Sequence, residues 1–126
     1  MQYQPTRPSF LPPVVKNLMI LNGLMFLVQA LYPEVTKYVM LYFPTSPNFE
    51  PYQIVTNIFA HASLWHLAGN MLSLWIFGAM LENVWGPKRF LTFYLATGLG
   101  ATLVHTLFNA YTIYNALGTF SPEGIL

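Results

Sequence analysis

The chain has 126 residues, of which 55% are hydrophobic and 7% are charged, and its formal net charge is +1. Soluble domains carry about 25% charged residues, so this composition argues against a soluble domain, and it offers no basic face for nucleic acid. The absence of cysteine excludes disulfides, thiolate metal sites and a cysteine nucleophile.

The first apolar run lies at 14–32, after a lead-in whose four prolines block a helix. It is interrupted by four polar residues, Lys16, Asn17, Asn22 and Gln29. A spanning helix needs about 20 residues, and the run reaches that length if the Lys16 side chain snorkels. The alternative is a signal peptide, but no small-residue cleavage site follows Gln29. We therefore predict a first spanning helix here.

The segment at 33–63 carries prolines and charges, and is not predicted to span the bilayer. Its aromatic residues include Tyr38, Tyr42, Phe43, Phe49 and Tyr52. Aromatic residues at this density are typical of a membrane interface. A plain solvated loop is the alternative, although loops longer than about 15 residues are usually functional.

Two further spanning helices are predicted, at 64–85 and 90–110, joined by a Gly86-Pro87 turn. Small residues in the third, among them Gly98 and Gly100, predict close helix packing. Residues 111–126 are polar and follow the third predicted span.

The basic residues predict the orientation of the chain. Three spans place Arg7, Lys16, Lys88 and Arg89 on one side and Lys37 on the other. Because basic residues gather on the cytoplasmic side, we expect a cytoplasmic N-terminus and an outward-facing loop at 33–63.

Polar and small residues recur at helical spacing through the second span. His66 and Asn70 are four residues apart, so both project from one helix face. Polar groups inside a spanning helix normally face a bundle interior or a wet cavity. The full motif is His61-x4-His66-x3-Asn70, followed by Gly78-x3-Glu82-x3-Gly86-x2-Arg89.

This motif resembles the second transmembrane helix and following turn of the rhomboid intramembrane serine proteases. The resemblance covers roughly residues 50 to 100 well, and the remainder by hydropathy alone. It implies that residues 1–126 are the N-terminal part of an all-α membrane protein, contributing three helices to a six-helix transmembrane bundle. It also implies that the first loop forms short helices lying half in the bilayer.

Rhomboids use a Ser–His dyad, with the serine in a G-x-S-G-type motif on the fourth helix and the histidine on the sixth. Neither motif is found here, because Ser63, Ser73 and Ser121 lack the glycine context and His105 lies on the third span. We therefore expect this chain to end before the nucleophile, and to be inactive alone.

The resemblance assigns His66 and Asn70 as donors to the oxyanion that forms on the substrate carbonyl. The alternative is that both satisfy interhelical hydrogen bonds. Glu82 lies about 18 Å along the helix from Asn70, so we expect a cap for the turn, paired with Arg89, instead of a catalytic acid. The motif residues expected to be structural are His61, Gly78, Glu82, Gly86 and Arg89, and His105 is expected to be a packing residue.

The predicted function is a serine endopeptidase that cleaves transmembrane protein substrates, in contact with membrane lipid and without a cofactor. The predicted location is a multi-pass position in the bacterial inner membrane. The alternative is an inactive rhomboid-like protein that binds transmembrane clients; the presence of both His66 and Asn70 favours the protease. A zinc site at His61 and His66 is not expected, because HExxH is absent and Glu82 is too distant.

Overall fold

The computed structural model describes residues 7–118, and this part of the chain contains helices and loops but no strand. Three long helical rods dominate it: α1 (Pro13–Leu31), the rod at 64–85, and α6 (Pro87–Leu117). All three are long and apolar enough to cross a membrane, by length and composition. The predicted all-α membrane bundle is therefore confirmed for the described residues.

The second rod consists of α4 (Leu64–Ser73), the π-helical turn η2 (Leu74–Gly78) and α5 (Ala79–Trp85). It begins at Ser63, whose hydroxyl accepts a hydrogen bond from the His66 backbone N–H at 3.1 Å, a helix cap typical of serine. It ends at Gly86, whose φ of 88° lies where residues with a Cβ are strained. Pro87 then starts α6, since a proline fits the first helical position.

The third predicted span, 90–110, lies inside the longer helix α6. This helix covers Pro87–Leu117, and its 31 residues are about 47 Å long. A bilayer core is about 30 Å thick. Residues 111–117 are polar enough to leave lipid, but they contain neither proline nor glycine, so nothing in them stops a helix.

The first loop contains three short helical segments: η1 (Pro33–Val35), α2 (Thr36–Val39) and α3 (Gln53–Thr56). The Thr56 hydroxyl donates to the Val39 carbonyl at 2.8 Å and so joins α3 to α2. Close packing at the small residues of the third span is seen at Gly98, where the partner is the first loop: a Cβ on Gly98 would meet Ile58 at 3.0 Å. Among residues 7–118, a Cβ on Gly100 would meet nothing within 4 Å.

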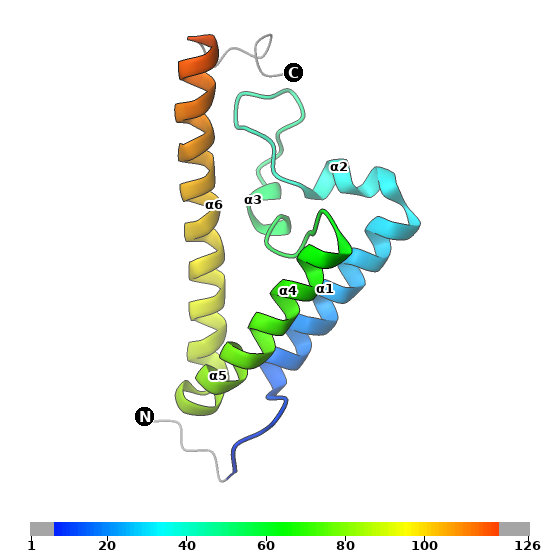
Figure 1. Cartoon of the computed structure of the whole chain (residues 1–126), viewed down its shortest axis with the longest axis vertical. Helices are drawn as coiled ribbons and strands as arrows, with labels where there is room; N and C mark the ends of the chain where they lie inside the picture. The colour runs from blue at the N-terminus through cyan, green and yellow to red at the C-terminus, as the bar shows by residue number, and fades with distance from the viewer. Residues whose placement is uncertain (1–6, 119–126) are drawn as a thin grey trace.

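Figure 1 shows α1 lying alongside α4 and α5, while α6 rises from the Gly86 turn and diverges from them. The three rods meet close to this turn. There the buried core consists of Val15, Leu18, Leu74 and Phe90. Gly78 permits this contact, because a Cβ at that position would meet Phe90 at 3.0 Å and Val15 at 3.2 Å.

Candidate functional site

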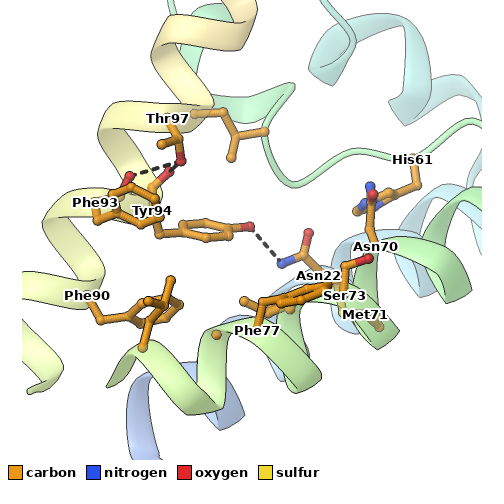
Figure 2. A pocket seen from close by; sticks show the side chains of 14 residues that line it. Asn22, His61, Asn70, Met71, Ser73, Phe77, Phe90, Phe93, Tyr94 and Thr97 are labelled. Atoms are coloured by element: carbon orange, nitrogen blue, oxygen red, sulfur yellow. Dashed lines mark hydrogen bonds between the residues drawn. The ribbon is translucent and has the colours of Figure 1, made fainter. Parts of the chain in front are cut away.

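A cavity of about 360 Å³ lies where α6 diverges from α1 and the second rod. Figure 2 shows side chains from all three rods and from the first loop around it. Its polar lining residues are Asn22, His61, Asn70, Ser73, Tyr94 and Thr97. The cavity therefore combines an apolar wall with a few polar groups, which is the usual character of a binding site.

His66 and Asn70 lie on α4, near the N-terminal end of the second rod. Asn70 lines the cavity, and His66 lies one turn closer to the loop, outside the lining. Both residues are exposed, and neither side chain forms a hydrogen bond with residues 7–118. Both side chains thus remain available as donors in this part of the protein.

His61 connects this end of α4 to α1 and to the cavity. His61 is 3% exposed, and its ring contacts the His66 ring edge to face, with centroids 5.2 Å apart. The Gln29 side chain binds both backbone groups of His61: Oε1 accepts from the N–H and Nε2 donates to the carbonyl, each at 3.2 Å. Gln29 therefore fixes His61, and His61 packs against His66.

Burial lowers the pKa of His61 below its ordinary value, because a buried imidazole is poorly solvated when charged. The neighbouring His66 lowers this pKa further, and the backbone of Phe59 opposes both effects. Among the described residues, the His61 Nδ1 atom has no hydrogen-bond partner. His61 is therefore expected to be neutral at pH 7.

Stability is consequently expected to fall as the solution is acidified. An unfolded His61 takes up a proton near its ordinary pKa of 6.5, whereas the folded one does so only at lower pH. Stability from this residue is complete above pH 6.5 and is lost as the pH falls towards the folded pKa. Thermal unfolding in detergent at several pH values measures this loss of stability. The His61→Asn variant should show a weaker dependence of stability on pH. An unchanged slope in that variant would rule out His61 as its source.

Asn22 and Tyr94 join α1 to α6 across the cavity. The Asn22 amide donates to the Leu18 carbonyl at 2.7 Å and, through a long contact of 3.5 Å, to the Tyr94 hydroxyl (Figure 2). Asn22 is 1% exposed, and its Oδ1 has no hydrogen-bond partner among the described residues. This part-buried contact connects the two helices where they begin to separate.

Glu82 binds the start of α1, so the expected pairing with Arg89 is wrong. Its two carboxylate oxygens accept from the backbone N–H groups of Val14 at 3.0 Å and Val15 at 2.8 Å. The first N–H groups of a helix have no partner within it, and a carboxylate is stabilised at that end by the helix dipole. Arg89 is exposed at the surface beside Lys88.

Three further expectations concern His105, a metal site and Ser121. His105 was expected to be a satisfied packing residue; within residues 7–118 it is exposed on α6, and its Nε2 lies 3.2 Å from the Asn109 amide. Within residues 7–118, no group of three histidine, cysteine or acidic side chains is placed to hold a metal ion. Ser121, one of the serines considered above, lies outside the described residues.

Asn22 and Gln29 were not predicted to take part in the site, and were noted only as polar interruptions of an apolar run. The spacing of these two residues in the sequence could have indicated that they share one face of the helix. Asn22 and Gln29 are seven residues apart, close to two helical turns, and they share a buried face with Val15 and Leu18. Polar residues on the same helix face as the core are expected to have specific partners.

Comparisons with known proteins identify relatives of this chain. The model of the rhomboid domain matches residues 48–119. RHOMBOID-like protein 12, mitochondrial, of Arabidopsis thaliana is 29% identical over 88% of this chain and 32% of its own length. Presenilin-associated rhomboid-like protein, mitochondrial, of Bos taurus is 29% identical over 72% of this chain and 23% of its own.

A bacterial relative, Rhomboid protease GluP of Bacillus subtilis, is 36% identical over 55% of this chain and 14% of its own length. No solved structure matches the chain. The chain thus spans about a third or less of the length of these curated relatives.

Proposed function

This chain belongs to the rhomboid family, and on that premise we propose that it is the oxyanion-side, N-terminal part of an intramembrane serine endopeptidase. The observation that carries the proposal is that the side chains of His66 and Asn70 are exposed and free to donate hydrogen bonds. Both are exposed on one helix, neither side chain has a hydrogen-bond partner among the described residues, and Asn70 lines a cavity at the end of that helix.

The proposed chemistry is hydrolysis of a peptide bond in a transmembrane protein substrate. A serine hydroxyl from the remainder of the protein attacks the carbonyl carbon, and a histidine from that same part takes the serine proton. The carbonyl oxygen gains negative charge as the carbon becomes tetrahedral. His66 and Asn70 donate hydrogen bonds to that oxygen, in a site where little water competes.

The neighbours of His66 support its role as a positioned group. Its backbone N–H is held by Ser63 and its ring by His61, whose backbone is in turn bound by Gln29. Catalytic donors need supporting contacts of this kind, because small displacements from the reacting atom reduce the rate strongly. Gln29 and His61 are thus proposed as positioning residues that act through His66.

The test compares the full-length protein with the 126-residue chain in lipid vesicles containing a single-span reporter. Cleavage by the full-length protein and none by the chain alone is expected. If the full-length protein binds the reporter without cleaving it, the alternative of an inactive client-binding protein holds. Cleavage by the chain alone, abolished by Ser63→Ala or Ser73→Ala, would show that the nucleophile has been misplaced.

Integral membrane character follows from the family and the three long apolar helices, and we propose the bacterial inner membrane with a cytoplasmic N-terminus. The relatives include mitochondrial proteins and a bacterial one, and the proposed orientation rests on the basic residues. Arg7 and Lys16 lie just before and in the first turn of α1, whose start is bound by Glu82 of α5, and Lys88 and Arg89 open α6. These four basic residues are therefore near the Gly86 turn, whereas Lys37 lies in the first loop.

Single cysteines are expected to label from opposite sides of the membrane at the first loop and at the Gly86 turn. Thr45 is the suitable loop position because it is exposed, whereas the neighbouring Ser46 is 9% exposed and accepts from the Asn48 N–H. Lys88→Cys reports on the turn. A membrane-impermeant maleimide added to intact cells should modify Thr45→Cys alone. Equal modification of both from outside would contradict the three-span topology.

A further inference from the structure

A second cavity, of about 390 Å³, lies within the first loop, separate from the site above. Three tyrosines line it: Tyr38 from α2, Tyr42 from the following segment and Tyr52 next to α3. Lys37 and Glu50 supply one positive and one negative charge to the same cavity. The proposed peptidase chemistry uses none of these five residues.

The cavity is built around a buried glutamine. Gln53 is 1% exposed; its Oε1 accepts from the Glu50 N–H at 3.1 Å and the Tyr42 N–H at 3.4 Å, and its Nε2 donates to the Asn48 carbonyl at 3.0 Å. One side chain thus holds three points of the 42–50 segment. The cavity wall is a fixed structure, since leaving these buried groups unpaired would be costly.

The two charges of the cavity are not neutralised by the described residues. Neither Lys37 nor Glu50 forms an ion pair within residues 7–118, and the Lys37 ammonium lies 5.2 Å from the centre of the Tyr38 ring. A cavity with one free cation and one free carboxylate complements a ligand that carries both charges. The tyrosine rings favour an ammonium group in particular, because a cation is attracted to the face of an aromatic ring.

The position of the cavity suggests where such a ligand comes from. The loop joins the end of α1 at Leu31 to the start of α4 at Leu64, so it lies where two membrane-crossing helices reach the same surface (Figure 1). Tyrosines concentrate at this depth, where lipid headgroups begin. Zwitterionic headgroups carry a phosphate and an ammonium a few atoms apart.

We propose that this cavity binds the headgroup of a zwitterionic phospholipid from the leaflet that the loop faces. Lys37 binds the phosphate, and Glu50 with the tyrosine rings binds the ammonium. A bound lipid would connect the first loop to the bilayer at a defined point. Anionic lipids without an ammonium group leave Glu50 unpaired and fit less well.

The test titrates the full-length protein in a nonionic detergent with phosphatidylethanolamine, phosphatidylcholine and phosphatidylglycerol of identical acyl chains, with binding followed by native mass spectrometry. Both zwitterionic lipids should bind at least about 10-fold more tightly than phosphatidylglycerol. Lys37→Met and Glu50→Gln should each remove most of this preference. Both residues are exposed, so these variants are expected to fold normally.

Matched controls are Lys88→Met, an exposed base at the Gly86 turn, and Glu34→Gln, an exposed acid in η1 outside the cavity lining. Both should bind lipid like the unmodified protein. Binding of water-soluble glycerophosphoethanolamine is measured in the same way. This soluble headgroup should bind far more weakly than phosphatidylethanolamine. Equal binding of phosphatidylglycerol, equal loss in the control variants, or equally tight binding of the soluble headgroup would overturn the proposal.

Discussion

Replacing Glu82 with methionine is expected to lower the free energy of unfolding by about 3 kcal/mol, because hydrogen bonds to charged groups contribute about 1.5–3 kcal/mol each. The carboxylate is 2% exposed and accepts from two N–H groups at the start of α1. Methionine keeps the volume of the side chain and leaves both donors unpaired. Val15, one of the two, is fully buried.

Thermal or denaturant unfolding in detergent micelles measures this effect. Glu82→Gln should be intermediate, because the amide keeps one acceptor oxygen but loses the charge that interacts with the helix dipole. Glu34→Gln removes an exposed acid and serves as the matched control, with a change within about 0.5 kcal/mol. A Glu82→Met variant as stable as that control would show that the contact with α1 contributes nothing.

The second large effect is expected in catalysis. In the full-length protein, His66→Ala and Asn70→Ala should each reduce kcat by about 10²–10³, the usual result of removing one oxyanion donor. The KM for a transmembrane substrate should change little, because the hydrogen bond forms chiefly in the transition state. Steady-state cleavage of a reporter in vesicles gives both constants.

The double variant should lose less than the product of the two single losses, since both donors serve one oxygen. His105→Ala and Asn17→Ala are matched controls, because these exposed residues lie outside the cavity lining. Unfolding must be measured in parallel, as His66 also contacts the His61 ring. Normally folded single variants with an unchanged kcat would contradict the oxyanion role.

Local patterns in the sequence were sufficient to predict the three long helices. Hydropathy located α1 and the second rod to within a residue or two, and Gly86-Pro87 marked the turn between the second and third. Polarity located the third span at 90–110, whereas the helix α6 that contains it continues to Leu117. Polarity indicates whether a residue lies in lipid, and glycine and proline are the usual signals for the end of a helix.

The partners of the polar residues could not be predicted, because they come from distant parts of the chain. Glu82 is separated by 68 and 67 residues from the two groups that it binds. Nothing within the Glu82–Arg89 segment indicates α1, and Arg89 was the nearest opposite charge. Gln29 likewise binds His61 across 32 residues. Such contacts depend on how the helices pack, which local periodicity does not determine.

The motif was more informative than periodicity for the candidate site. Spacing alone placed His66 and Asn70 on one face of a helix, and it left a structural role equally open. The structure adds the cavity beside Asn70 and the supporting contacts of His61 and Gln29. The first loop was predicted as interfacial, but its cavity depends on the side chain of Gln53 reaching back to 42–50.

The most direct test of the proposed function is active-site labelling of the full-length protein with a fluorophosphonate, followed by mapping of the modified serine. The reagent needs an activated serine and builds negative charge on an oxygen, as peptide cleavage does. The labelled serine is expected to lie outside residues 1–126, and His66→Ala and Asn70→Ala should slow its labelling. Labelling of Ser63 or Ser73, or labelling at an unchanged rate in both variants, would contradict the assignment of this chain to the oxyanion side.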